Sequence, residues 1–214
     1  MAIKAILFDM DGVLIDAKDW HYEALNKALA IFGMEISRES HLTRFDGLPT
    51  KKKLEMLSKE CSLPTELHTF INDLKQRFTM DAIALYCRPV FRHEFALRKF
   101  HEDGYKIAVC SNSIRESIIT MMAKAYLDDY IDVIFSNEDV DQPKPHPEIY
   151  LSAMKYFNLD PDQCLIVEDN ENGIRAAKAS GGHLLVVKNI SETNWTNISN
   201  KILEIENSNS EVLR

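Results

Sequence analysis

The chain has 214 residues, of which 45% are hydrophobic and 27% charged, and this composition is ordinary for a soluble globular protein. Its length allows one hydrophobic core, or a core with a small second domain. Asp and Glu number 33 against 25 Lys and Arg, which gives a formal net charge of −8. That balance argues against non-specific nucleic-acid binding, because such binding needs clustered basic residues.

The sequence contains four cysteines: Cys61, Cys87, Cys110 and Cys164. Their spacing fits neither a redox pair nor a zinc site, so we expect free, buried thiols in a reducing compartment. No apolar run approaches the length of a membrane span. The N-terminal apolar run is short and carries two aspartates, which is unlike a signal peptide. We therefore expect a cytoplasmic, monomeric protein with no nucleic-acid or membrane partner.

The first 86 residues predict one strand followed by helices. Residues 4–8 form an apolar run that is typical of a buried parallel strand. Apolar residues then recur at helical spacing over 20–32, and Gly33 ends that helix. Residues 34–49 are polar and we expect them to be irregular. Thr50 is expected to cap the N-terminus of the next helix, and a further helix is expected over 64–85.

From Pro89 onward, strands and helices alternate. The predicted strands are 106–110, 133–135, 164–167 and 184–187, and the predicted helices are 89–103, 113–125, 147–157, 171–180 and 194–205. This alternation predicts a parallel sheet with helices on both faces. The tail from Asn207 is polar and expected to fray.

The expected fold class is therefore α/β. Residues 1–15 and 87–214 are predicted to form a Rossmann-like core with a parallel sheet. Residues 16–86 lack a convincing strand, so they are predicted to form a small, all-helical cap domain inserted into that core.

The first strand ends in Asp9 and Asp11, which Gly12 follows. Carboxylates are costly to desolvate at the end of a buried strand unless something compensates them. In open parallel sheets, ligands bind beyond the carboxyl ends of the strands. The sequence therefore predicts that this strand delivers two carboxylates to a functional site.

The later strands also end in polar residues. The second ends in Ser111-Asn112, the loop after the third contains Lys144, and the fourth ends in Glu168-Asp169. Several carboxylates in one crevice repel one another, and a divalent cation relieves that repulsion. Oxygen ligands without Cys or His favour Mg²⁺ over Zn²⁺. Lys144 and the Ser111 hydroxyl suit an anion beside that metal, with phosphate the leading candidate.

Four motifs carry a family resemblance, and they span nearly the whole chain: Asp9-Met10-Asp11-Gly12-Val13-Leu14, Ser111-Asn112, Lys144-Pro145 and Glu168-Asp169. The chain resembles a haloacid-dehalogenase-superfamily hydrolase of the subgroup with a helical cap after the first strand. That subgroup includes phosphoglycolate phosphatases and β-phosphoglucomutases. The resemblance implies a phosphoric monoester hydrolase that uses Mg²⁺.

The resemblance also implies a role for each position. Asp9 is similar to the family nucleophile, which forms an aspartyl-phosphate, and Asp11 to the general acid–base. Ser111 and Asn112 would hold the transferring phosphoryl group, and Lys144 would offset its charge.

For Mg²⁺, the resemblance implies Asp9, the Asp11 carbonyl and Asp169 as direct ligands. Glu168 would act through water or from behind these ligands. His21 and Thr50, in the expected cap, are candidates for contact with the substrate, while a structural or exposed role for His21 is the alternative.

Plainer interpretations exist for each motif. Asp9 and Asp11 could mark a solvated turn, Ser111-Asn112 and Glu168-Asp169 could be helix caps, and Lys144 could be a solvated loop lysine. The agreement among strand ends favours the site.

Three functions compete. A phosphatase of small phosphate monoesters, with sugar phosphates favoured, is expected first. A β-phosphoglucomutase-type mutase is the alternative, but Asp46 and Thr50 stand where that type carries Lys and Arg, and Ala17 where it carries Thr. A non-catalytic, regulatory member is the third possibility, although every catalytic position is filled. The substrate is not named by the sequence.

Overall fold

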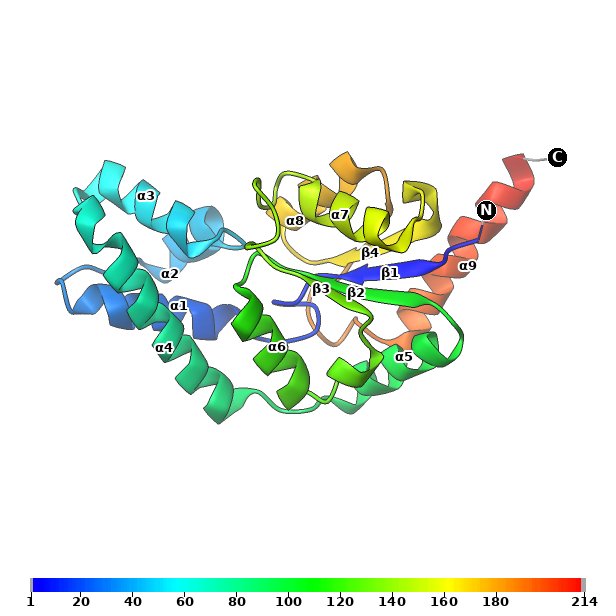
Figure 1. The fold of residues 1–214 in the computed structure, drawn as a ribbon, viewed down its shortest axis with the longest axis horizontal. Helices are drawn as coiled ribbons and strands as arrows, with labels where there is room; N and C mark the ends of the chain where they lie inside the picture. The colour runs from blue at the N-terminus through cyan, green and yellow to red at the C-terminus, as the bar shows by residue number, and fades with distance from the viewer. Residues whose placement is uncertain (1, 213–214) are drawn as a thin grey trace. The chain divides into compact units, whose positions relative to one another are not determined.

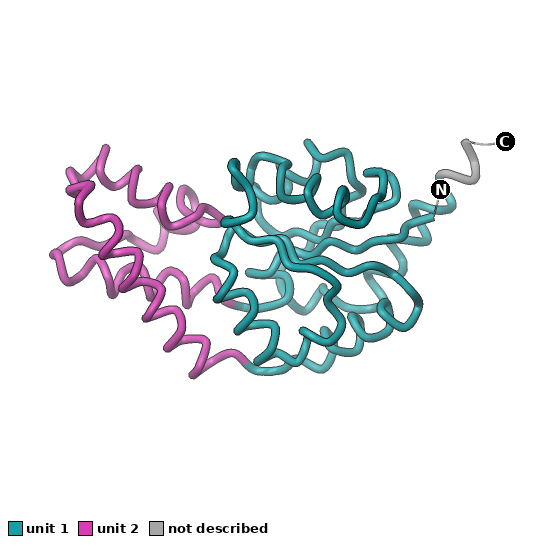
Figure 2. The backbone as a smooth tube through the Cα atoms, in the orientation of Figure 1, with its two compact units in different colours: residues 1–16, 88–214 teal, residues 17–87 magenta. Residues whose placement is uncertain are grey.

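The computed structural model describes the backbone of residues 2–212 and the side chains of residues 2–208. The chain divides into two compact units (Figure 2). Unit 1 comprises Met1–Asp16 and Arg88–Arg214, and unit 2 comprises Ala17–Cys87. Each boundary lies one residue later than the boundary expected from the sequence. The function of unit 2 as a cap stays a prediction.

Unit 1 is built on a five-stranded parallel sheet with the strand order β3-β2-β1-β4-β5 (Figure 1). The strands are β1 Ala5–Phe8, β2 Lys106–Cys110, β3 Val133–Phe135, β4 Cys164–Glu168 and β5 His183–Val186. The central strand β1 is buried along its whole length, as its continuous apolar sequence predicts. The predicted Rossmann-like α/β fold is confirmed.

Helices cover both faces of this sheet. They are α5 Phe91–Glu102, α6 Arg115–Lys124, α7 Glu148–Phe157, α8 Glu171–Ser180 and α9 Trp195–Val212, with short 3₁₀ turns at Asp128–Tyr130 and Pro161–Gln163. In Figure 1, α7 and α8 lie on one face and α5, α6 and α9 on the other. This arrangement follows from right-handed crossovers that run in opposite directions from the centre of the sheet.

The strand register brings three strand ends to one level. Phe8 pairs with Val109 of β2 and with Val167 of β4. The backbone N–H of Asp9 still donates to the Val167 carbonyl at 3.0 Å. Asp9 therefore enters the carboxyl edge of the sheet beside the last residue of β4, Glu168.

All regular secondary structure in unit 2 is helical. Its elements are α1 Lys18–Ala30, α2 Arg38–Ser40, a π-helical turn at His41–Phe45, α3 Thr50–Cys61, a 3₁₀ turn at Thr65–Leu67 and α4 His68–Tyr86. Leu25, Phe45, Leu54 and Ile71 belong to one buried apolar cluster. Unit 2 therefore has a hydrophobic core of its own.

Two expectations for unit 2 were wrong. Residues 38–45 are helical rather than irregular, because the Ser37 hydroxyl accepts from the Ser40 N–H and the buried Phe45 anchors the turn. Thr50 does not cap α3. Pro49 occupies the N-cap with extended backbone, and Thr50 is already the first helical residue.

Two further expectations need correction. Cys87, Cys110 and Cys164 are buried thiols as expected, but Cys61 is exposed at the end of α3. The last helix continues to Val212 instead of ending near 205, since the polar residues after Asn207 include no Gly or Pro. The predicted bounds of β2, β3 and α8 match the structure, and α4 begins at His68, four residues after Pro64, since the 3₁₀ turn Thr65–Leu67 precedes it. The remaining element ends lie within two residues of the predictions.

Candidate active site

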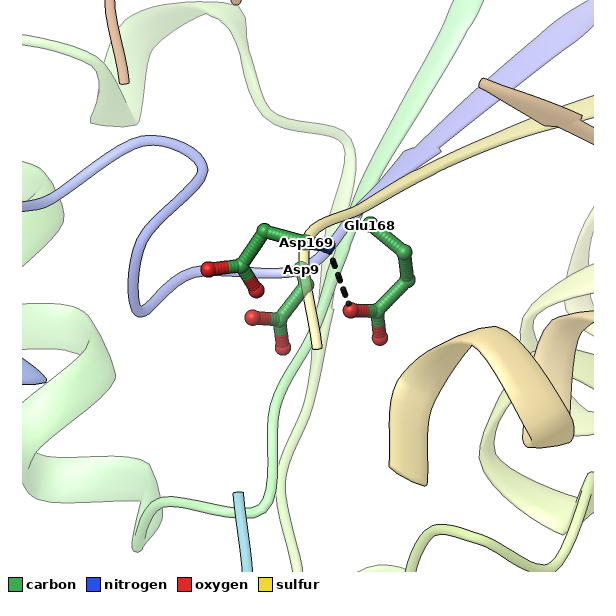
Figure 3. Close-up of side chains that lie close together, drawn as sticks. All are labelled: Asp9, Glu168 and Asp169. Carbon is green, nitrogen blue, oxygen red and sulfur yellow. Dashed lines mark hydrogen bonds between the residues drawn. The ribbon is translucent and has the colours of Figure 1, made fainter. Parts of the chain in front are cut away.

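Three carboxylates converge at the carboxyl edge of the sheet (Figure 3). Asp9 follows β1, while Glu168 ends β4 and Asp169 follows it. Oxygen atoms of these three side chains all lie within 4.8 Å of one another. The expectation that the first and fourth strands bring Asp9, Glu168 and Asp169 to one edge of the sheet agrees with this geometry, while Asp11 is not among the three converging side chains.

Lys144 joins this cluster from the loop between β3 and α7. Its ammonium lies 2.7 Å from Asp9 Oδ1 and 2.6 Å from Glu168 Oε1, and only 2% of the residue is exposed. Burial alone would lower the pKa of Lys144, but the two carboxylates raise it above its ordinary value. Lys144 is therefore a fixed cation and not a solvated loop lysine.

Asp9 is in a costly environment despite this cation. Burial and the neighbouring Glu168 carboxylate raise the pKa of Asp9 well above its ordinary value, and the Lys144 ammonium opposes them only in part. Asp169 and Asp11 add to the repulsion. The site therefore contains more negative charge than one lysine offsets.

The donor set fits a hard divalent cation. The three converging groups, Asp9, Glu168 and Asp169, are all oxygen donors, and the set contains no thiolate and no imidazole. Their mutual repulsion is the condition that a bound dication would relieve. The residues present therefore fit Mg²⁺, as expected from the sequence.

The loop after β1 is folded so that the Asp11 side chain contacts the loop after β2. The Gly12 N–H donates to the Ile15 carbonyl at 2.7 Å, and Gly12 has a φ of 89°, which favours glycine. The Ser113 hydroxyl donates to Asp11 Oδ2 at 3.0 Å. Ser113 was not identified as a site residue from the sequence, although it directly follows the Ser111-Asn112 motif.

Asn112 acts on the loop that carries Lys144. Its Oδ1 accepts from the Lys144 N–H at 3.0 Å, and its Nδ2 donates to the Lys144 carbonyl at 3.2 Å. Ser111 is buried, and its Oγ accepts from the Ser113 N–H at 3.1 Å. Neither residue caps α6, whose N-cap is Ile114. The contact of Ser111 and Asn112 with a phosphoryl group stays a prediction.

Glu168 is surrounded by donors on both of its oxygens. Oε1 accepts from Lys144 and from the Tyr150 hydroxyl at 2.5 Å, and Oε2 accepts from the Asp169 N–H at 3.1 Å. Burial raises the pKa of the Tyr150 hydroxyl well above its ordinary value, so this hydroxyl stays a donor. Tyr150 was not predicted as a site residue.

A glycine makes room for Glu168 beneath the first turn of α8. A Cβ atom added at Gly173 would lie 1.8 Å from Glu168 Oε1. The N-cap of α8 is Asn170, whose Oδ1 accepts from the Gly173 N–H at 3.0 Å. Glu168 and Asp169 are therefore not the cap of this helix.

The two other predicted site residues, His21 and Thr50, belong to unit 2. Within that unit, the Lys75 ammonium contacts His21 Nδ1 at 3.3 Å. Thr50 opens α3. The Lys18 ammonium lies 3.6 Å from an Asp46 oxygen. Contact of His21 and Thr50 with a substrate stays a prediction.

Comparison with known proteins identifies the family. The family model of haloacid dehalogenase-like hydrolases matches residues 6–187, which is most of the chain. The chain belongs to this family. The expectation of a haloacid dehalogenase-like hydrolase is thus confirmed.

Curated relatives of this haloacid dehalogenase-like hydrolase include phosphatases. It is 31% identical to hexitol phosphatase B of Escherichia coli K12 over 195 residues, covering 86% of this chain and 83% of that protein. It is 27% identical to a phosphorylated carbohydrates phosphatase of Thermotoga maritima over 182 residues, covering 84% and 82%. These relatives support a phosphoric monoester hydrolase.

The fold of this hydrolase matches a solved structure along its whole length. β-Phosphoglucomutase from Clostridium difficile superimposes with a TM-score of 0.82 at 24% identity, over 99% of this chain and 100% of that one. At that identity the likeness shows the fold alone.

Over the described residues, no helix combines the length and apolar character that crossing a membrane requires.

Proposed function

We propose that this protein is a Mg²⁺-dependent phosphatase that hydrolyses a small phosphate monoester through an aspartyl-phosphate on Asp9. The observation that carries the proposal is the buried contact of the Lys144 ammonium with Asp9, in a cluster that Glu168 and Asp169 complete. A carboxylate beside a cation and further oxygen donors is suited to attack on a phosphate ester, because phosphoryl transfer depends mainly on positioning and charge stabilisation.

In the first step, an Asp9 carboxylate oxygen attacks the phosphorus atom and the ester oxygen leaves. Burial makes the charged form of Asp9 poorly solvated, and Lys144 holds one of its oxygens in place. The ammonium also offsets part of the negative charge that the phosphate brings. The bond formed is the Asp9 acyl phosphate, and the bond broken joins phosphorus to the ester oxygen.

Asp11 serves as the general acid and then as the general base. It gives a proton to the departing alkoxide, and it takes a proton from the water that attacks the phosphorus of the intermediate. The Ser113 hydroxyl donates to Oδ2 of Asp11, which orients that carboxyl group. The second step releases inorganic phosphate and restores the Asp9 carboxylate.

Asp9, Asp169 and the Asp11 carbonyl would hold Mg²⁺, with Glu168 close behind them. When bound, Mg²⁺ supplies charge neutralisation to the carboxylates and to the phosphate oxygens. Ser111 and Asn112 would position the phosphoryl group at the end of β2.

Sugar phosphates are the favoured substrate class. Two relatives in the comparison are named for hexitol and for phosphorylated carbohydrates. We assign substrate selection to unit 2, with His21 and Thr50 as candidate contacts. The cytoplasmic location and the monomeric state stay predictions from the sequence.

A phosphosugar mutase is the alternative within the same family. It is disfavoured because Asp46, where that type carries a lysine, places a carboxylate at a position that would repel a second phosphate. A non-catalytic role is disfavoured because Asp9, Asp11, Lys144 and Asp169 are all present.

The proposal is tested by phosphate release with Mg²⁺ from a panel of sugar, polyol and nucleotide monophosphates. Asp9→Asn is the blank, and the exposed Asp129→Asn is the matched control for loss of one carboxylate. We expect release from a narrow set of sugar phosphates by the wild type and the control, but not by the blank. No release from any ester, with conversion of β-glucose 1-phosphate to glucose 6-phosphate, would establish the mutase instead.

A further inference from the structure

We infer that Tyr150 is a positioning residue for the reaction: its hydroxyl shares Glu168 Oε1 with Lys144 and thereby holds the Lys144 ammonium against Asp9. This inference rests on the proposed function. The Tyr150 side chain contacts Glu168 and Lys144 and forms no hydrogen bond with Asp9 among the described residues, so its effect on Asp9 passes through Glu168 and Lys144.

The contacts that carry the inference are short and buried. The Tyr150 hydroxyl donates to Glu168 Oε1 at 2.5 Å, and Lys144 Nζ lies 2.6 Å from the same oxygen. Lys144 Nζ is also 4.8 Å from the centroid of the Tyr150 ring. Tyr150 thus acts on Lys144 in two ways, through the shared carboxylate oxygen and through a cation–π contact. All three side chains are at most 2% exposed.

The shared oxygen decides how Lys144 divides its charge. The Lys144 ammonium has two close carboxylate partners, Asp9 Oδ1 at 2.7 Å and Glu168 Oε1 at 2.6 Å. A hydroxyl donor on Glu168 Oε1 stabilises part of that oxygen's charge, so Lys144 is drawn less strongly toward Glu168. The ammonium then remains oriented toward Asp9 and toward the phosphate that Asp9 attacks.

The remaining contacts of Glu168 prevent it from moving to compensate. Its Oε2 accepts from the Asp169 N–H at 3.1 Å and from Asn170 Nδ2 at 3.4 Å. Gly173 packs so closely that a Cβ atom there would overlap the carboxylate. Since these contacts hold Glu168 in place, we expect removal of the Tyr150 hydroxyl to change mainly the position of the Lys144 ammonium.

Packing alone does not require this hydroxyl. The Tyr150 ring belongs to the apolar cluster of unit 1 that includes Leu7, Ala108 and Ile166. A phenylalanine would keep the ring in that cluster and remove only the donor to Glu168. Tyr150→Phe therefore separates the positioning role from core packing.

The test compares Tyr150→Phe with Tyr156→Phe on the same helix, where Tyr156 is 61% exposed. For Tyr150→Phe we expect kcat to fall about 10- to 100-fold, and KM to change less than about threefold. Losses of this size are usual when a residue that hydrogen-bonds the groups of a metal site is removed. The melting temperature should stay within a few degrees of the wild type. Tyr156→Phe should keep both kinetic constants.

A double-mutant cycle separates action through Glu168 from a general structural effect. In the Glu168→Gln background, the further change Tyr150→Phe should alter kcat by less than about threefold, because the group through which it acts has lost its charge. Full additivity of the two losses would overturn the inference. Equal kcat for Tyr150→Phe and an active wild type would also overturn it.

A crystal structure of Tyr150→Phe provides a readout without turnover. We expect Lys144 to shift away from Asp9 toward Glu168. Unchanged contacts of Lys144 with both carboxylates would contradict the inference even if activity fell. A wild type that releases no phosphate from any ester would overturn the proposed function instead. The structural comparison would then still decide whether the Tyr150 hydroxyl holds Lys144 against Asp9.

Discussion

The Lys144 ammonium lies 2.7 Å from Asp9 Oδ1 although 135 residues separate them in the sequence. Both residues are buried at the carboxyl edge of the parallel sheet, one after β1 and the other after β3. This contact makes Lys144 part of the buried acidic cluster that Asp9, Glu168 and Asp169 form.

Lys144→Met should remove activity and destabilise unit 1. Without the ammonium, Asp9 and Glu168 would be left as buried carboxylates without their cation, which typically costs about 3–5 kcal/mol. Urea unfolding in EDTA measures the loss of free energy of unfolding. Lys155→Met, at an exposed position on α7, is the control and should change it by less than about 0.5 kcal/mol. Similar stabilities for the two variants would contradict a buried ion-pair role.

Asp9→Asn should stabilise the metal-free protein at neutral pH. Because the folded-state pKa of Asp9 is raised above 3.8, the folded protein keeps a proton that the unfolded chain has lost. The stability contributed by this protonated form is full below the unfolded pKa and is lost as the pH rises through the folded pKa. Between these two pKa values, the free energy of unfolding of Asp9→Asn should therefore increasingly exceed that of the wild type as the pH rises.

Thermal unfolding in EDTA at a series of pH values measures this gain. Asp129→Asn serves as the control at an exposed position. Adding Mg²⁺ should raise the melting temperature of the wild type more than that of Asp9→Asn, since the wild type has one more carboxylate to bind it. A wild type that becomes more stable relative to Asp9→Asn as the pH rises would show that the sign is wrong.

Gly173→Ala should displace the Glu168 carboxylate and thereby lower activity. The new Cβ would lie 1.8 Å from Glu168 Oε1, so either Glu168 or the first turn of α8 must move. We expect kcat to fall at least about 10-fold, as is usual when a residue that orients the ligands of a metal site is disturbed. Lys178→Ala, at an exposed position of the same helix, should leave kcat unchanged. Normal kinetics for Gly173→Ala would mean that Glu168 is not fixed as described.

Ser113→Ala should lower kcat by about 10-fold, because it removes the hydrogen bond that orients Asp11, and such a bond typically contributes about 0.5–1.5 kcal/mol. Ser117→Ala is a matched control: Ser117 is buried on the neighbouring helix α6, and its hydroxyl has no hydrogen-bond partner among the described residues. Steady-state kinetics of both variants decide the matter. Equal kcat values would exclude a positioning role for the Ser113 hydroxyl.

The parallel sheet and the convergence of its acidic ends could be predicted from the sequence. Continuous apolar runs such as Ala5–Phe8 and Cys164–Val167 specify buried parallel strands, and the carboxyl ends of such strands meet. Asp9, Lys144, Glu168 and Asp169 follow from that rule, because each directly follows or ends a strand or lies in a strand-following loop.

The supporting residues could not be predicted in the same way. Tyr150 and Gly173 lie in helices, and their importance depends on which side chain faces them after folding. Tyr150 has the pattern of an ordinary core aromatic residue, since its hydroxyl partner is 18 residues away in the sequence. Ser113 had a local signal, its position after Ser111-Asn112, but the contact with Asp11 is set by tertiary structure.

Local structure in unit 2 was harder to predict than the sheet. Residues 38–45 are mostly polar, and only two of them, His41 and Phe45, are buried, so their helical turns leave little periodic pattern. Thr50 has the chemistry of an N-cap, but the extended backbone of Pro49 places the helix start one residue earlier than that role requires.

The central claim is that Asp9 takes the phosphoryl group, and borohydride reduction during turnover tests it most directly. Reduction of an acyl phosphate on Asp9 would leave homoserine at position 9, which peptide mass spectrometry detects. We predict homoserine at position 9 only when Mg²⁺ and a phosphate ester that the enzyme hydrolyses are both present. Reduced residues elsewhere, or none in an enzyme that is releasing phosphate, would contradict the mechanism.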